Sequence, residues 1–291
     1  MNKKSKNDIA GGQAVIEGVM MRHGNKIATA VRDPNKNIII KEQTYIPISK
    51  RFKIAATPFL RGFITLIEML IIGSKHLFFS ASVAIDEDSQ KNAKKNNWEL
   101  PISLAISIGF VIVFFIAIPA LFFTIMKNNI ENTILLNFLE GIVRLSIFLI
   151  FLLSTLFMED MRRVFMYHGA EHKTVFAWEK GVDLTIENVK QFSTKHPRCG
   201  TSFLLIVMFV SVAIFSLLGR PDFLHRIIYK LLLMPVISGI SYEIIRFTGK
   251  FFDNKFIRVL SWPGLLLQNI TTREPTDDQI EVAIAAMKKV I

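Results

Sequence analysis

Four long apolar runs constrain what this chain can fold into more than any other feature. They cover residues 100–126, 134–157, 200–219 and 223–245. Each run is long enough to cross a hydrocarbon core of about 30 Å as a helix. The seven residues KNNIENT separate the first two runs, and the three residues RPD separate the last two. Such short links predict two transmembrane helical hairpins.

Composition and charge agree with a membrane protein. Charged residues make up 20% of the chain, against about 25% in soluble domains, and the mean hydropathy is +0.39. Residues 1–57 hold eleven Lys/Arg, 158–199 hold seven and 246–291 hold seven, while each short link holds one. Because Lys- and Arg-rich segments stay in the cytoplasm, we expect both termini and the central segment there. The lone Cys199 permits no intrachain disulfide and suits a reducing compartment.

The N-terminal region is predicted to form a small antiparallel β meander. Between residues 13 and 48, three runs rich in β-branched residues are separated by the turn sequences HGN and DPNKN. The preceding Gly-Gly-Gln at 11–13 is interpreted as a flexible entry to the sheet. Three strands alone are marginally stable in water. We therefore expect the meander to lean on the later cytoplasmic segments or on the membrane surface.

A helical stretch is predicted from Pro58 to about residue 85. It is long enough to span a bilayer, but it carries four ionisable side chains: Arg61, Glu68, Lys75 and His76. We therefore favour an interfacial or re-entrant amphipathic helix over a transmembrane span. A polar loop follows to residue 99.

The C-terminal tail is predicted to be amphipathic. Residues 250–269 mix aromatic, aliphatic and basic residues, as a membrane-surface segment would. Beyond them, Thr276 and Gln279 form a capping-box signature at the start of a final helix. We expect its apolar stripe to dock on the rest of the cytoplasmic part.

The predicted fold is therefore a membrane α-helical protein with four transmembrane helices and a small cytoplasmic α+β part. Its expected segments, in chain order, are the meander (1–57), the amphipathic helix and polar loop (58–99), the first hairpin (100–157), a central cytoplasmic loop (158–199), the second hairpin (200–245) and a tail of amphipathic helices (246–291).

The strongest chemical motif is HGAEH in the central loop. His168 and His172 stand four residues apart and share one face if the segment is helical. Two such imidazoles can bind one metal, and Glu171 could act as a base. The motif follows the inverted zinc-protease pattern His-x-x-Glu-His, although Gly169 weakens a helix by about 1 kcal/mol. The alternative is an ordinary hydrogen-bonded network beneath the membrane.

A second polar island, KHPRCG, offers further ligands. His196 and Cys199 could complete a site for a divalent metal such as zinc, and Arg198 would favour a thiolate. Glu243 is another candidate for the third ligand. The alternative is that Pro197 marks a helix entry and that Cys199 is a small buried residue.

Other charges are candidates for a polar centre or for partner contacts. Glu140 and Arg144 are four apart within an apolar run, so we expect a pair that packs within the membrane or meets a partner. Glu17 and Arg22 could join the histidine centre. The cations at the start of the fourth run are expected to lie near the interface and snorkel: His225, Arg226 and Lys230. So few buried polar groups argue against a transporter.

Four sequence blocks, taken in order, carry a family resemblance. They are GGQAVIEGVMMR (11–22), YHGAEHKTVFAWE (167–179), HPRCGTSF (196–203) and PGLLLQNITTREPTDDQIEVAI (263–284). The chain thus resembles the YqhQ family of bacterial membrane proteins over nearly its whole length. The resemblance implies the same fold and topology in the bacterial inner membrane. The family is a domain of unknown function, sometimes labelled a predicted metal-dependent enzyme, and its genes often lie near those for ribosomal and translation-termination proteins.

Two functions follow as hypotheses. The first is a metal-dependent, hydrolase-like activity at the cytoplasmic face. The second is a non-catalytic accessory role in membrane-protein biogenesis, in which the basic cytoplasmic face docks on the Sec translocon, an insertase or the ribosome. The lipid bilayer is a partner in either case, and a homo-oligomer stays open. Anionic lipid would also attract the basic face, so composition does not separate the two functions.

Overall fold

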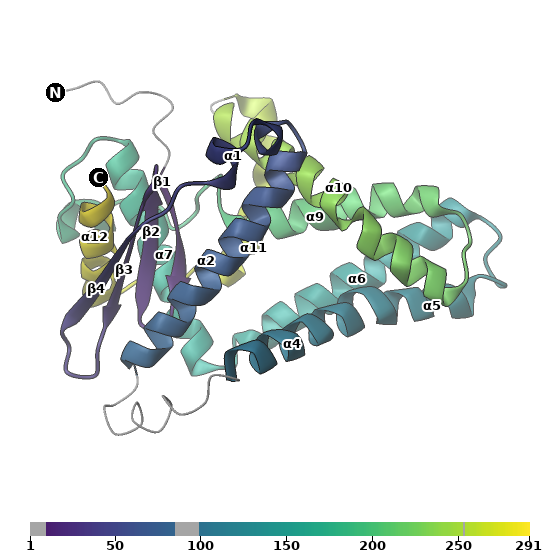
Figure 1. Cartoon of the computed structure of the whole chain (residues 1–291), viewed down its shortest axis with the longest axis horizontal. Coiled ribbons are helices and arrows are strands. Elements are labelled where there is room, and N and C mark those ends of the chain that lie inside the picture. Colours follow the sequence, from purple (N-terminus) through teal and green to yellow (C-terminus); the bar gives the residue numbers. More distant parts are fainter. Residues whose placement is uncertain (1–9, 85–98, 253) are drawn as a thin grey trace.

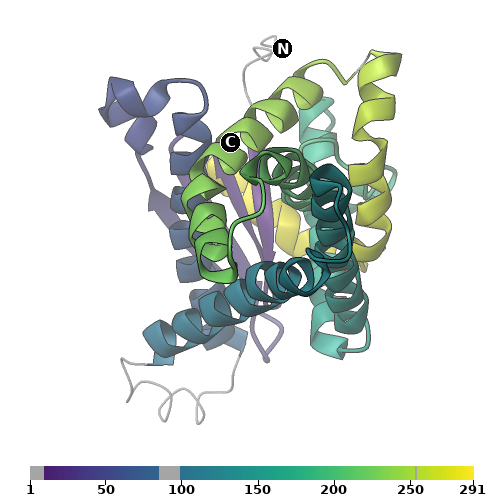
Figure 2. The same cartoon turned by 90° about the vertical axis from the view of Figure 1, so that its right-hand side faces the viewer.

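The computed structural model of the chain describes residues 10–84, 99–252 and 254–291. A small antiparallel sheet, covered by helices on both faces, lies at one end of the molecule (Figure 1). Long apolar helices project from it to the other end. Figure 2 looks along these helices towards the sheet. The two parts therefore form a sheet-containing head and a helical bundle.

The sheet has four strands in the order β1-β2-β3-β4, all antiparallel to their neighbours. The strands are β1 (Ala10–Val15), β2 (Gly18–His23), β3 (Lys26–Arg32) and β4 (Ile38–Thr44). The expected three-stranded meander is therefore wrong by one strand. The run QAVIEGVMMR turns back on itself at Ile16 and Glu17, where Glu17 adopts a φ of +49° and Val15 pairs with Gly18.

Both faces of the sheet are buried because its apolar residues do not alternate with polar ones. On one face, Val19 and Met21 pack against α7 (Glu159–Glu179) and α12 (Asp277–Val290). On the other, Met20 and its neighbours pack against α2 (Leu60–Ala84). Adjacent strand residues point to opposite faces, so this run of apolar residues fills two cores. The meander thus leans on segments that are distant in sequence, and the capping box at the start of α12 is present.

Helix α2 connects the head to the bundle. The short helices α1 (Ile48–Arg51) and η1 (Lys53–Ala56) precede it. The buried carboxylate of Glu68 accepts from the Tyr45 hydroxyl (2.7 Å) and the Ile48 N–H (2.5 Å). The side of α2 that faces away from the sheet exposes large apolar side chains, among them Leu70 and Ile71. Helix α2 thus has one face on the sheet and an exposed apolar side.

The bundle consists of helices whose length and composition suit a membrane. They are α4 (Glu99–Ile112), continued by a π-helical turn η2 (Val113–Ala117) and α5 (Ile118–Met126), then α6 (Thr133–Thr155), α9 (Gly200–Phe215), extended by η3 (Ser216–Leu218), and α10 (Phe223–Lys250). With α2, they make five candidate spans among the described residues. Their outward surfaces are apolar and exposed, which implies contact with lipid.

Glu140 on α6 holds the bundle together from inside. Its carboxylate accepts hydrogen bonds from Arg226 and Lys230 of α10 and from Arg144 of α6 (3.3 Å). Arg226 and Lys230 are fully buried. The expectation that they snorkel is therefore wrong: α6 places a carboxylate opposite them, and a buried ion pair replaces water. By contrast, His225 is exposed and bonds Asp222.

Arg144 also donates a hydrogen bond to a backbone carbonyl that lacks its usual partner in the neighbouring helix. Pro119 has no N–H to donate to the carbonyl of Phe115, one turn back in the same helix. Arg144 Nε donates to that carbonyl at 3.0 Å, and its Nη1 donates to the Ser211 hydroxyl at 3.0 Å. The Glu140–Arg144 pair thus links α6 to η2, α9 and α10.

Replacing Glu140 with Ala should destabilise the bundle by about 3–5 kcal/mol, because buried cations lose their shared acceptor. Thermal unfolding in mild detergent would show a lower Tm and less monodisperse protein. Glu131→Ala, in the exposed link before α6, is the control. Combining Glu140→Leu with Arg226→Met and Lys230→Met should recover much of the loss. Equal Tm values for Glu140→Ala and Glu131→Ala would contradict this role.

Candidate functional site

The central segment predicted as a loop contains a long helix, α7, which carries the HGAEH motif. Gly169 lies within this helix at a point where another segment of the chain packs directly against its backbone. A Cβ at this position would overlap the carbonyl oxygen of Arg273, in the link between α11 (Lys255–Thr271) and α12. The Arg273 N–H donates to the carbonyl of Phe165 at 2.9 Å. Gly169 therefore lets α7 and this link meet backbone to backbone.

Cys199 comes to the same place from the other side. It is the N-cap of α9, where its Sγ accepts from the Thr201 N–H at 3.4 Å. Its Sγ lies 3.2 Å from Nε2 of His168. The candidate ligand atoms of His168, His172 and Cys199 all lie within 4.8 Å of one another. The structure thus gathers three of the four predicted metal ligands.

Both histidines are oriented by backbone carbonyls. Nδ1 of His168 lies 2.8 Å from the carbonyl oxygen of Thr271, and Nδ1 of His172 lies 2.5 Å from that of Thr194. A carbonyl only accepts, so each Nδ1 donates to its carbonyl, and Nε2 is the ring nitrogen left to bind a metal. Metal-binding histidines are usually held in this way. The donor set of two imidazole nitrogens and one sulfur fits a zinc-type ion.

Glu171 lies beside this cluster rather than in it. Its side chain is buried, accepts from the Gly12 N–H, and has Oε2 3.6 Å from Nε2 of His172. Burial raises the pKa of this carboxyl, although the neighbouring His168 and His196 oppose the shift. A lone pair on His172 that faces a carboxylate is unfavourable unless a proton or a cation lies between them.

His196, the fourth predicted ligand, is a neighbour of the cluster. Its ring lies 5.7 Å from that of His172, and its Nε2 is 3.5 Å from Oε2 of Glu179. Burial lowers the pKa of His196, and Glu179 partly offsets this. Burial alone would raise the pKa of Glu179, but His196 and Arg198 outweigh it and lower that pKa. Arg198 thus bonds Glu179, whereas the sequence suggested that it supports the thiolate.

A cavity of about 420 Å³ opens onto the cluster. Arg22, one of the predicted polar-centre residues, lines it together with Glu171 and the two histidines of α7. Glu17 lies elsewhere: it forms a two-pronged ion pair with Arg163 at 2.5 Å. The cavity therefore combines a candidate metal site with an arginine.

The remaining predicted residues are not part of this centre. Glu243 pairs with Arg61 of α2 at 2.5 Å, and Cys199 takes the third position in the cluster. Glu140 and Arg144 belong to the ion-pair network within the bundle.

Sequence reasoning missed several backbone groups of the site. The N–H of Gly12 and the carbonyls of Thr194 and Thr271 orient its side chains. The Gly-Gly pair did carry a signal, because a strand glycine often marks close approach to another group. A Cβ at Gly12 would meet the side chain of Glu171. The two carbonyls carried no signal, since any residue supplies one.

The fold and the polar centre define a class: an α-helical membrane protein whose candidate site lies where the helical bundle meets a small sheet. The chain belongs to the family described as protein of unknown function (DUF1385), which matches residues 57–291. It is also similar to the "Uncharacterized protein YqhQ" of Bacillus subtilis (strain 168). The two are 32% identical over 291 residues, which cover 97% of this chain and 92% of that protein. The expected family resemblance is thus confirmed. No solved structure matches the chain.

Changing Gly169 to Ala should destabilise the protein by about 1–3 kcal/mol, because the added methyl forces α7 away from the Arg273 carbonyl. Gly109→Ala in α4 is the matched control, since nothing lies within 4 Å of a Cβ there. Thermal unfolding should show a lower Tm for the first variant and an unchanged or higher one for the second. An unchanged Tm for Gly169→Ala would mean that α7 tolerates a wider gap.

Proposed function

We propose that this chain is an integral protein of the bacterial inner membrane with a metal-dependent, hydrolase-like activity at the cytoplasmic face. The observation that carries the proposal is the convergence of two carbonyl-oriented imidazoles and a cysteine sulfur in one cavity. The Lys and Arg distribution favours both termini and the central segment in the cytoplasm, and four helical spans, an even number, agree with that orientation. In this arrangement α2 lies on the membrane surface, since one face packs on the sheet and the other is apolar.

A set of three candidate ligands is more typical of a catalytic metal site than of a structural one. Catalytic zinc sites usually have three protein ligands and one open position, whereas structural sites have four. His168, His172 and Cys199 would hold the ion, and the cavity lies beside them. A bound divalent cation would supply Lewis-acid polarisation of a carbonyl or phosphoryl oxygen.

Glu171 is the candidate general base. Its carboxylate lies 3.6 Å from the second imidazole and lines the same cavity, so it can take a proton from a water molecule there. Its raised pKa brings it closer to neutral pH, where a general base works best. The Gly12 N–H fixes the carboxylate. Arg22 supplies a positive charge that suits an anionic or strongly polar substrate group.

Purified protein should contain about one zinc or iron ion per chain, by elemental analysis after chelator-free purification. His168→Ala, His172→Ala and Cys199→Ser should each lose it, because a site with two ligands binds far more weakly. His225→Ala, at an exposed histidine, is the control and should keep the metal. No metal in the wild type, even with zinc offered back, would make the cluster structural. The search would then turn to docking on the translocon, an insertase or the ribosome.

Glu171→Gln should keep the metal and lose catalysis. We expect hydrolysis of p-nitrophenyl acetate by the metal-loaded protein to fall by about 100-fold or more, since the amide cannot accept the proton. Glu187→Gln, on the exposed surface of α8 (Ile186–Lys190), is the matched control. Hydrolysis that persists in Glu171→Gln at the wild-type rate would remove Glu171 as the base.

A further inference from the structure

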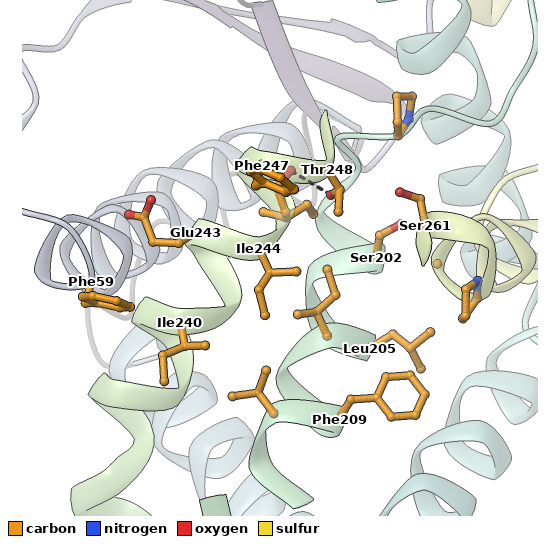
Figure 3. Close-up of a pocket in the computed structure, with 16 residues that line it drawn as sticks. Phe59, Ser202, Leu205, Phe209, Ile240, Glu243, Ile244, Phe247, Thr248 and Ser261 are labelled. Carbon is orange, nitrogen blue, oxygen red and sulfur yellow. Dashed lines mark hydrogen bonds between the residues drawn. The ribbon is translucent and has the colours of Figure 1, made fainter. Parts of the chain in front are cut away.

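A second, larger cavity lies on the outer surface of the bundle. It has a volume of about 700 Å³ and is bordered by α9, α10 and α11 (Figure 3). Figure 3 shows Ile240 and Ile244 of α10 and Leu205 and Phe209 of α9 lining it. This volume is in the range of small-molecule sites. Two lining side chains at its edge, Phe209 and Phe247, are more than half exposed, so the groove opens to the surface that faces lipid.

The two cavities share a wall. Pro197 and Ser202 line the apolar groove, while His196, Arg198 and Cys199 line the candidate catalytic cavity. One short segment, 196–202, therefore lines the groove with some of its residues and the candidate catalytic cavity, including the candidate ligand Cys199, with others. A molecule held in the groove lies against the back of the site.

The end of the groove next to this wall is basic and aromatic. The turn from α10 to α11 follows the lining residues Phe247 and Thr248 and precedes Ser261. The helix ends on either side of this turn expose four cationic side chains: Arg246 and Lys250 of α10, and Lys255 and Arg258 of α11. The first half of α11 also exposes two large aromatic residues, Phe256 and Trp262. Aromatic and basic residues together mark the level of the membrane interface, where anionic head groups lie.

Arg198 connects the end of α10 to the site. The methylene groups of its side chain pack against Gly249 of α10, where a Cβ would overlap them. Its guanidinium bonds Glu179, which in turn lies 3.5 Å from His196. The basic end of the groove and the candidate catalytic cavity are thus joined by one side chain.

We infer that the groove binds an anionic membrane phospholipid. One acyl chain lies between α9, α10 and α11, and the phosphate lies among the four cations on either side of the α10–α11 turn. The apolar lining, the opening to lipid and the cationic end each match one part of such a molecule.

The test is photocrosslinking in nanodiscs with phosphatidylglycerol that carries a diazirine on its acyl chain. Labelled peptides should come chiefly from the groove walls of α9, α10 and α11. Ile206→Trp fills the groove and should remove most of this label. Leu204→Trp, on the exposed side of α9 away from the groove, is the matched control and should leave it unchanged.

The head-group contact has its own test. Lys255→Ala should weaken retention of phosphatidylglycerol by about fivefold in native mass spectrometry, with phosphatidylcholine retention unaffected. Lys288→Ala, at an exposed residue of α12, should leave both unchanged. Equal labelling of all lipid-facing helices, unchanged by Ile206→Trp, would overturn the proposal. A photoreactive residue introduced at position 206 gives a second check: a crosslink to protein instead of lipid would also overturn it. Neither readout needs the metal, so a metal-free protein that passes both would refute only the catalytic function.

Discussion

The backbone contact between α7 and the link that follows α11 is the constraint on which the candidate site depends. At Gly169 the backbones of the two segments are so close that a methyl group does not fit between them. This proximity brings the carbonyl of Thr271 to the imidazole of His168 and keeps the ring turned towards Cys199. A helix with any other residue at this position would stand further away, and the imidazole would lose its orienting partner.

The site is assembled from four distant parts of the chain. β1 supplies Gly12, α7 supplies the histidines and Glu171, the segment before α9 supplies Cys199, and the end of α11 supplies Thr271. Packing of α7 against the sheet and α12 fixes the first two parts, while α9 and α11 fix the others. This assembly explains where the candidate site lies. Its polar groups gather where the head meets the bundle, because apolar helices do not surround them there.

Much of the architecture could be predicted from sequence because its signals are local. Long apolar runs, Thr276 with Gln279, and two histidines at helical spacing each depend on residues close together in the chain. The misses depended on distant partners. Arg226 and Lys230 look like interfacial cations until Glu140, far earlier in the chain, is placed opposite them.

The extra strand was missed for a different reason. The turn at Ile16 and Glu17 lacks the Asn, Asp or Pro that usually marks a hairpin, and only the following Gly18 hints at it. The site shows the same division. His168 and His172 could be paired by spacing alone, whereas the choice of Cys199 over His196 and Glu243 needed the fold.

The network around Glu140 also bears on how the protein is made. The first hairpin carries Glu140 with Arg144 one turn away, so its charges are matched as soon as α6 forms. The second hairpin brings Arg226 and Lys230, whose carboxylate partner lies on α6. The two cations of the second hairpin therefore gain a carboxylate partner only when the first hairpin is already in place. Synthesis from the N-terminus supplies the two in that order, and a second hairpin made alone would expose two unmatched cations to lipid, a signature by which unassembled protein can be recognised and degraded.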